Sequence, residues 1–206
     1  MQNAIRIAVL VSGGGTNLQA LIDAEKSGII QSGEIKLVIS SNAEAYALKR
    51  AEENGIPAVT ISKKEYGSTA AMEKKMITVL EDYQIDLIVL AGYLCILSEN
   101  FTRKYERRIL NVHPSLIPSF CGEGFYGLKV HEAVLAKGVK VTGATVHFVN
   151  EIPDGGEIVL QKAVNVSKRD TPKSLQAKVM KRAEWIILPR AVESVSKEML
   201  ERKKLK

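Results

Sequence analysis

Two polar side chains stand close together in a pattern suited to chemistry, Asn111 and His113, within the segment Asn111-Val112-His113-Pro114. Residues two apart on a β-strand face the same side, so the amide and the imidazole should project together. An amide can donate a hydrogen bond to a developing oxyanion, and an imidazole can supply or accept a proton near neutral pH. The pair suits acyl transfer, although a strand-capping Asn beside a hydrogen-bonded surface His would show the same pattern.

Asp154 is a third residue that could join this pair, in the turn Asp154-Gly155-Gly156. Aspartate is common in turns because its side chain bonds its own backbone, so the residue alone is a weak signal. If the turn aims the carboxylate at His113, the carboxylate would orient the imidazole and raise its pKa.

Other reactive side chains carry weaker signals. His147 is expected to be a structural residue or to support the site from behind. A metal site made of His113, His131 and His147 is disfavoured, because their spacing matches no metal motif, and we expect no metal. Cys95 and Cys121 have no neighbouring base in the sequence and are expected to be plain thiols.

A glycine loop, Ser12-Gly13-Gly14-Gly15-Thr16-Asn17, follows the first apolar run. Amides at the start of a helix favour an anion, and glycines let a ligand approach the backbone. A dinucleotide fingerprint fits poorly, because its third glycine is Leu18 here and the next strand ends Ser40-Ser41-Asn42 without an acid. We therefore expect a phosphate cradle; the alternative is a Gly-rich turn in which Thr16 caps the helix.

Strands alternating with helices must position these residues. Continuous apolar runs predict buried parallel strands at 5–11, 35–40, 58–61, 87–91 and 108–113. Helical spacing predicts helices at 17–26, 45–54, 70–83, 99–105 and 130–137. The strands at 142–150 and 158–166 are expected to form an edge hairpin. A last helix should begin at Thr171-Pro172 and run to about Lys197, with a bend at Pro189.

This order predicts an α/β fold: a Rossmann-like, mostly parallel twisted sheet with helices on both faces, an antiparallel edge hairpin and a C-terminal helix. No repeat or linker interrupts the pattern. We expect one domain over 1–206, in which about 172–206 form the C-terminal helix and a basic tail.

Composition is that of an ordinary soluble protein, with 46% hydrophobic and 25% charged residues. The sequence shows no signal peptide, membrane span or disulfide framework, which favours the cytoplasm. The net charge of +6 suits solubility or attraction for small anions. Aromatic residues make up only 5% and do not alternate with basic ones, so nucleic-acid binding is not expected.

Five segments, taken together, resemble the phosphoribosylglycinamide formyltransferases, folate-dependent enzymes of purine synthesis within the wider formyltransferase superfamily. The resemblance runs from Ile7 to about Arg190. It is carried by Ser12–Asn17 with Leu18-Gln19, Leu90–Tyr93 with Ile96-Leu97-Ser98, Leu110–Pro118, Gly143–Val149 and Asp154-Gly155-Gly156.

The resemblance implies transfer of a formyl group from 10-formyltetrahydrofolate, as co-substrate, to the amine of 5'-phosphoribosylglycinamide. It implies small-molecule substrates, no nucleic acid, no membrane, and a monomer or homodimer. Asn111 and a protonated His113 would stabilise the oxyanion while Asp154 supports His113, so these three residues would be catalytic.

The binding residues follow from the same resemblance. The substrate would be held by Gly15, Thr16, Asn17, Lys181 and Glu184. The folate would be held by Leu94, Cys95, Ile96, Leu97, Asn111, Asn150, Glu151, Ile152, Pro153 and Asp154. The Ile117-Pro118 bond is expected to be cis.

The chain departs from the family pattern in three places. Cys95 and Thr69 stand where the family often has arginines on the folate side, and Lys63 or Lys64 could substitute for them in holding the folate tail. The loop at 119–127 is longer than the family's usual Pro-Gly turn.

Four other functions fit the sequence less well. A formyltetrahydrofolate hydrolase would carry an extra N-terminal regulatory domain, and a methionyl-tRNA formyltransferase a C-terminal tRNA-binding domain. A phosphate-ligand-binding protein would not need Asn111, His113 and Asp154 together, and a dehydrogenase would not have Leu18 at the third glycine position.

Overall fold

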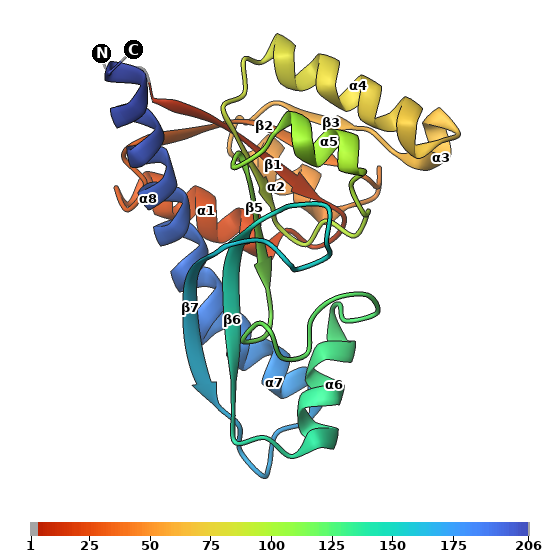
Figure 1. The fold of residues 1–206 in the computed structure, drawn as a ribbon, viewed down its shortest axis with the longest axis vertical. Coiled ribbons are helices and arrows are strands. Elements are labelled where there is room, and N and C mark those ends of the chain that lie inside the picture. Colours follow the sequence, from red (N-terminus) through yellow and green to blue (C-terminus); the bar gives the residue numbers. More distant parts are fainter. Residues whose placement is uncertain (1–3, 206) are drawn as a thin grey trace.

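A twisted sheet forms the centre of the molecule (Figure 1). A computed structural model describes residues 4–205; residues 1–3 and Lys206, part of the predicted N-terminal stretch and basic tail, lie outside them. Within residues 4–205 the sheet has seven strands, in the spatial order β3 (Ala58–Thr60), β2 (Gly33–Ser40), β1 (Ile5–Val11), β4 (Leu87–Leu90), β5 (Ile109–His113), β6 (Val141–Phe148) and β7 (Ile158–Asn165).

Strand directions match the sequence-based expectation. Strands β3, β2, β1, β4 and β5 run parallel to one another. Strand β6 runs antiparallel to both β5 and β7, so the edge of the sheet is an antiparallel hairpin. The predicted Rossmann-like, mostly parallel sheet with an antiparallel edge is confirmed.

The buried strands explain the continuous apolar runs. On β1, Ile7 and Val9 pack into the core on one face of the sheet, whereas Ala8 and Leu10 pack into the core on the other. All four side chains are fully buried. A strand covered on both faces needs apolar residues at successive positions rather than at alternate ones.

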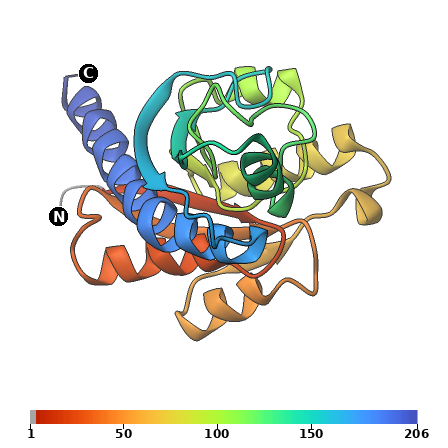
Figure 2. The ribbon, with the colours of Figure 1, turned by 90° about the horizontal axis from the view of Figure 1, so that it is seen from below.

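Helices cover both faces of the sheet, as Figures 1 and 2 show. One core contains side chains of α4 (Thr69–Asp82) and α5 (Glu99–Lys104). The other core contains side chains of α1 (Thr16–Lys26), α2 (Tyr46–Glu53), α6 (Leu128–Lys137), α7 (Pro172–Val179) and α8 (Trp185–Lys204). A short helix that the sequence pattern did not predict, α3 (Lys63–Tyr66), precedes α4.

The C-terminal helix corrects one prediction. It contains a π-turn, η1 (Met180–Glu184), continues through Pro189 and ends at Lys204 rather than near Lys197. Pro189 has no N–H for the carbonyl four residues earlier, that of Trp185, and its ring crowds that carbonyl. The π-turn ends just before Trp185. As predicted, Thr171 caps the helix and Pro172 is its first residue.

The strand order sets where a ligand can bind. Strands β2 and β3 extend from β1 on one side, and β4 and β5 extend on the other. Open α/β sheets bind ligands beyond the carboxyl ends of the strands where the order reverses. The glycine loop after β1, the segment after β4 and the end of β5 all lie at that edge. None of the helices in residues 4–205 combines the length and apolar character that crossing a membrane requires.

Candidate active site

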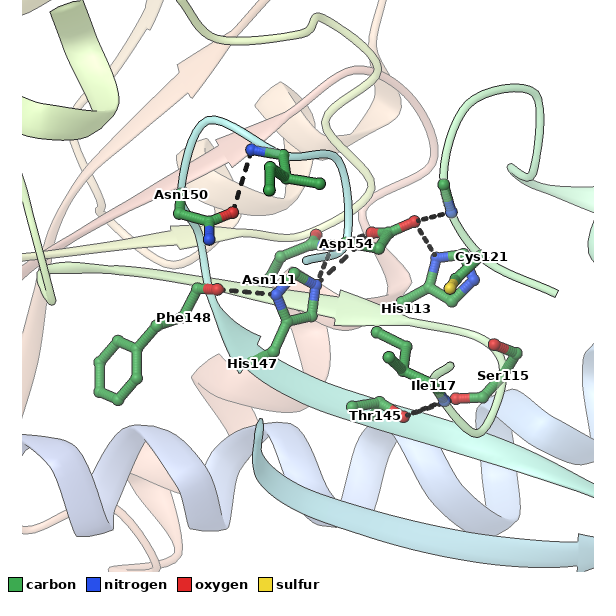
Figure 3. A network of polar contacts seen from close by, with 12 residues as sticks. Asn111, His113, Ser115, Ile117, Cys121, Thr145, His147, Phe148, Asn150 and Asp154 are labelled. Carbon is green, nitrogen blue, oxygen red and sulfur yellow. Dashed lines mark hydrogen bonds and ion pairs between the residues drawn. The ribbon is translucent and has the colours of Figure 1, made fainter. Parts of the chain in front are cut away.

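Four side chains form one polar cluster at the end of β5 (Figure 3): Asn111, His113, His147 and Asp154. His113 Nδ1 lies 3.3 Å from Asp154 Oδ2, and Asn111 Nδ2 lies 3.4 Å from Asp154 Oδ1. His113 is 4% exposed, so water has little access to the contact. The structure therefore brings together the three residues that the sequence singled out, on the shared side that strand alternation predicts.

The turn that carries Asp154 is held in an unusual backbone conformation. Asp154 has a φ of 56°, in the left-handed region where Asp and Asn are the best-tolerated side chains after glycine. Gly156 is required next to it, because a Cβ there would lie 1.7 Å from the carbonyl oxygen of Phe148. The backbone N–H of Gly122 donates to Asp154 Oδ2 at 2.9 Å. The turn and the 119–127 loop thus fix the carboxylate from two sides.

His147 supports the cluster from the neighbouring strand. In the antiparallel pairing of β5 with β6, His147 lies directly opposite Asn111. Its Nδ1 is 2.8 Å from the carbonyl oxygen of Phe148, which can only accept, so Nδ1 carries the proton. Its Nε2 is then free to accept from Asn111 Nδ2, 3.1 Å away. His147 Nε2 also lies 3.5 Å from Asp154 Oδ1, so this residue contacts two members of the predicted catalytic group.

The charge state of His113 differs from the sequence-based expectation. Burial lowers the pKa of His113 below its ordinary value; the Asp154 carboxylate and the carbonyl of Phe120 raise it but do not offset burial, and His147 lowers it further. Asp154 raises the pKa of His113, as predicted, but burial outweighs this effect, so the free protein favours the neutral ring over the protonated one that the resemblance implied. Desolvation is the larger effect because the ring is almost completely enclosed.

Asp154 is held in its charged form. Burial alone would raise its pKa, but the hydrogen bond with His147, the positive charge that His113 carries when protonated, and the Gly122 N–H together leave the pKa of Asp154 below its ordinary value. An ionised carboxylate beside a neutral imidazole is the arrangement of an acid–base pair that can take up a proton.

The 119–127 loop supplies contacts that no sequence pattern indicated. His113 Nε2 lies 2.9 Å from the carbonyl oxygen of Phe120, whose φ is 53°. Cys121 donates its thiol hydrogen to the carbonyl of Pro118 at 3.3 Å, and burial followed by the charge of Asp154 raises the pKa of this thiol. The loop is aperiodic, so only its length and its Gly content marked it as functional.

The loop is anchored below the site. The Ile117-Pro118 peptide bond is cis, as expected. Thr145 Oγ1 donates to the carbonyl of Ser115 at 2.7 Å and accepts from the backbone N–H of Ile117 at 3.1 Å. Figure 3 shows this anchor beside the polar cluster.

The glycine loop is open at the start of α1. The N-cap residue is Gly15, with a φ of 69°, and no side chain caps the helix, so Thr16 does not play the capping role of the alternative reading. A Cβ on Gly15 would lie 2.6 Å from that of Ala47, whereas Cβ atoms on Gly13 and Gly14 would meet nothing within 4 Å. Uncapped amides on an open surface at a positive helix end are suited to an anion.

Asn17 and Glu184 connect this loop to the π-turn. Asn17 Nδ2 donates to Glu184 Oε2 at 2.7 Å, and both side chains are buried, 8% and 6% exposed. Burial raises the pKa of Glu184 to about 7, and the Asn17 amide offsets only part of this effect. Lys181, on the same turn, is exposed. Of the predicted substrate residues, Lys181 is therefore exposed and Thr16 partly exposed, whereas Gly15, Asn17 and Glu184 are buried.

The predicted folate residues lie in two segments. Leu94 and Ile96 are 66% and 72% exposed, and Ile152 is 59% exposed. Cys95 is partly buried and Leu97 is buried, while Glu151 and Pro153 are exposed.

Local hydrogen bonds hold both segments in place. Ser12 Oγ accepts from the backbone N–H of Leu94 at 2.9 Å, and Asn150 Oδ1 accepts from that of Ile152 at 3.1 Å. Exposed apolar side chains near a polar cluster are typical of a ligand-binding surface.

A cavity of about 640 Å³ lies between α1 and α8, beside the glycine loop rather than at the polar cluster. Thr16, Arg50 and Trp185 are among the residues that line it. Across residues 4–205, no three His, Cys, Asp or Glu side chains are grouped as metal ligands would be.

Comparison with known proteins shows which family this chain resembles. Residues 5–192 match the model of the formyl transferase family. The chain is 45% identical over 194 residues to the trifunctional purine biosynthetic protein adenosine-3 of Gallus gallus, covering 94% of this chain but only 19% of that protein. It is 41% identical over 184 residues to phosphoribosylglycinamide formyltransferase of Haemophilus influenzae, covering 89% of this chain and 84% of that one.

Solved structures agree with the sequences. The crystal structure of glycinamide ribonucleotide transformylase 1 from Symbiobacterium toebii superposes with a TM-score of 0.88 at 39% identity, covering 95% of this chain and 89% of that one. The matched region includes every residue of the polar cluster. The chain belongs to the formyl transferase family.

Proposed function

We propose that this protein transfers the formyl group of 10-formyltetrahydrofolate to the amine of 5'-phosphoribosylglycinamide, giving formylglycinamide ribonucleotide and tetrahydrofolate. The observation that carries the proposal is the polar cluster, in which an amide, an imidazole and an ionised carboxylate converge at the carboxyl end of β5. Relatives that bear the names of this activity support it.

The substrates are assigned to the two sides of the cluster. The phosphate would bind the backbone of Gly15, Thr16 and Asn17, where the helix end favours an anion. The folate would lie against the exposed apolar side chains of 94–97 and 150–154. Lys181 is exposed near the substrate side and would add a positive charge for the phosphorylated substrate. Asn111 lies between the two sides.

The reaction begins when the amine attacks the formyl carbon. A carbon–nitrogen bond forms, and the electron pair of the carbonyl moves to oxygen. In the free protein the amide nitrogen of Asn111 contacts His147 and Asp154. In the proposed reaction, Asn111 donates one of these N–H groups to the oxyanion instead. Removing such a donor typically costs about two to three orders of magnitude in turnover.

The proton of the amine needs a base, and neutral His113 can be that base. After accepting it, the imidazolium has an acceptor for each ring nitrogen, Asp154 Oδ2 and the carbonyl of Phe120. Its positive charge also stabilises the oxyanion. When the bond to N10 of the folate breaks, the proton passes to N10, so tetrahydrofolate leaves neutral at that position. The lowered pKa of His113 suits it to start the cycle as a base.

The direct test follows the release of tetrahydrofolate by absorbance, with 10-formyltetrahydrofolate in the presence and absence of the ribonucleotide. We expect release only when the ribonucleotide is present, and loss of release in Asn111→Ala. Equal release without the ribonucleotide would make the protein a hydrolase. No release under either condition would indicate a phosphate-ligand-binding protein or a different formyl acceptor.

A further inference from the structure

The Asn17–Glu184 pair lies beneath the anion-binding end of α1 and has one group without a partner. Asn17 Nδ2 donates to Glu184 Oε2 at 2.7 Å, whereas Asn17 Oδ1 is buried and has no hydrogen-bond partner among the described residues. A buried amide oxygen without a donor is costly. The carboxyl of Glu184, which Asn17 already contacts, can supply a donor when it is protonated.

Protonation of Glu184 would satisfy this oxygen. A carboxylic acid facing a primary amide can donate its O–H to the amide oxygen while its carbonyl accepts from the amide nitrogen. An ionised carboxylate can only accept, and would leave Asn17 Oδ1 unpaired. The geometry of the pair therefore favours the neutral acid.

Charges around Glu184 do not oppose this state. Its pKa is raised to about 7 by burial, and the only other contribution comes from the Asn17 amide. Lys181 and Arg182 lie on the same π-turn but are exposed, and no charged group on any neighbouring element contributes to the shift. Glu184 can thus gain or lose a proton close to neutral pH.

The pair is also connected to the glycine loop through the backbone of Asn17. Asn17 is the second residue of α1, so its backbone belongs to the uncapped first turn that faces the open loop. Because Glu184 is buried and bonded to Asn17, a negative charge on it would lie close to the first turn of α1, in a low-dielectric interior where it would repel an anion strongly.

We propose that Glu184 and Asn17 form a proton-dependent support for the phosphate site, in which binding of an anion at the glycine loop is coupled to uptake of a proton by Glu184. This inference rests on the loop being the phosphate site of the proposed function. The neutral acid holds Asn17 by two hydrogen bonds and leaves the helix end free for the ligand. The ionised acid loses one bond and competes with the ligand for the same positive helix end.

The expected size of the coupling follows from linkage. If anion binding raises the pKa of Glu184 by one unit, the dissociation constant of the anion rises about fivefold between pH 6 and pH 8. At pH 7 about 0.4 proton is then taken up per anion bound. Glu184→Gln keeps an amide-sized neutral group at this position, so its affinity should change by less than about 1.5-fold over the same range.

The test measures binding of inorganic sulfate, which does not titrate in this pH range, and of ribose 5-phosphate. Calorimetry at pH 7 in two buffers with different ionisation enthalpies gives the number of protons exchanged. Proton uptake in the wild type that disappears in Glu184→Gln supports the inference. Proton release, or a pH dependence of equal size in Glu184→Gln, overturns it.

A second measurement does not depend on the variant being folded. The infrared carbonyl band of a protonated carboxyl group should grow when ribose 5-phosphate is added to the wild-type protein at pH 7, and its absence would contradict the proposal. Anion binding without proton exchange would overturn this inference and leave the phosphate site intact. Absence of anion binding at every pH would overturn the phosphate site and the coupling together.

Discussion

The polar cluster and the Asn17–Glu184 pair lie at the same edge of the sheet, but they differ in how completely their buried polar atoms have hydrogen-bond partners. In the cluster, each ring nitrogen of His113 and His147 has a polar neighbour, and both Asp154 oxygens accept. In the pair, Asn17 Oδ1 has no partner and a carboxyl titrates near neutral pH. A fully connected network is rigid, whereas a partly connected one can respond to a proton or a ligand.

This contrast assigns different tasks to the two regions. The cluster is arranged before any substrate arrives, which is what stabilisation of a transition state requires. The pair changes its bonding when its charge changes, which is what a ligand-responsive support requires. The predictions below test whether the first region acts on turnover and the second on binding and stability.

The largest effect is expected from Asp154→Asn. Asparagine has the same shape and tolerates the left-handed backbone at this position, so the turn should persist while the negative charge is lost. Turnover should fall by about two to three orders of magnitude. The measurement is tetrahydrofolate release, with Asp82→Asn, an exposed acid at the end of α4, as the matched control. Equal turnover in both variants would remove Asp154 from the mechanism.

Glu184→Gln should change the pH dependence of stability. The folded-state pKa of Glu184, about 7, is above its ordinary value of 4.5. Its contribution to stability is therefore fully present below pH 4.5 and is lost as the pH rises through 7. Relative to the wild type, the variant should gain up to about 3 kcal/mol in unfolding free energy between pH 4.5 and pH 8. Urea unfolding of the wild type and of Glu184→Gln at pH 4.5 and pH 8 tests this. If the unfolding free energies of both proteins change equally between the two pH values, the pKa of Glu184 is not raised by folding.

His147→Phe tests whether His147 positions Asn111 within the cluster. Phenylalanine fills the space of the ring but loses the bonds to Phe148 and Asn111. Turnover should fall roughly tenfold to a hundredfold through misplacement of Asn111, with a smaller change in KM. His147→Gln, whose amide can both donate and accept, should recover part of the loss. A rise in KM with unchanged turnover would place His147 in substrate binding instead.

The pH profile of turnover tests the charge state of His113. Because burial lowers its pKa below 6.5, the neutral base should persist through the neutral range. Turnover should decline about tenfold per pH unit only once the pH falls below that lowered pKa. A rate that instead increases on acidification would mean that the protonated ring is the active form, as the sequence had led us to expect.

The smallest effect is expected from Cys121→Ala. The thiol donates a hydrogen bond to the carbonyl of Pro118, and its raised pKa keeps it protonated at neutral pH. A protonated thiol is a poor nucleophile. Activity should stay within about twofold of the wild type, and a loss of more than tenfold would require thiol chemistry beside His113.

Strand-level features of this molecule could be predicted from the sequence. Apolar runs located the strands of the sheet, and the period of two placed Asn111 and His113 on the same side. Thr171-Pro172 marked the helix start through chemistry that depends only on local residues. These features follow from short-range rules, so a single sequence contains them.

Features that depend on distant contacts could not be predicted. Phe120 and Gly122 contact the cluster through backbone atoms, so their side chains carry no signal. The low pKa of His113 arises from enclosure by several elements, which no local pattern reports. The π-turn at 180–184 lies ahead of Pro189, the residue that the sequence made conspicuous, and no local sequence pattern marks it. His147 could have been found from the pairing of β6 with β5, had that register been known.

The fate of the formyl group tests the central claim most directly. The protein would be mixed with 10-formyltetrahydrofolate labelled with isotope in its formyl carbon, together with 5'-phosphoribosylglycinamide, and the products separated. Recovery of the label on the ribonucleotide, reduced at least about a hundredfold in Asp154→Asn, is the result that this account predicts. Recovery of the label as free formate, or transfer that is unchanged in Asp154→Asn, would contradict it.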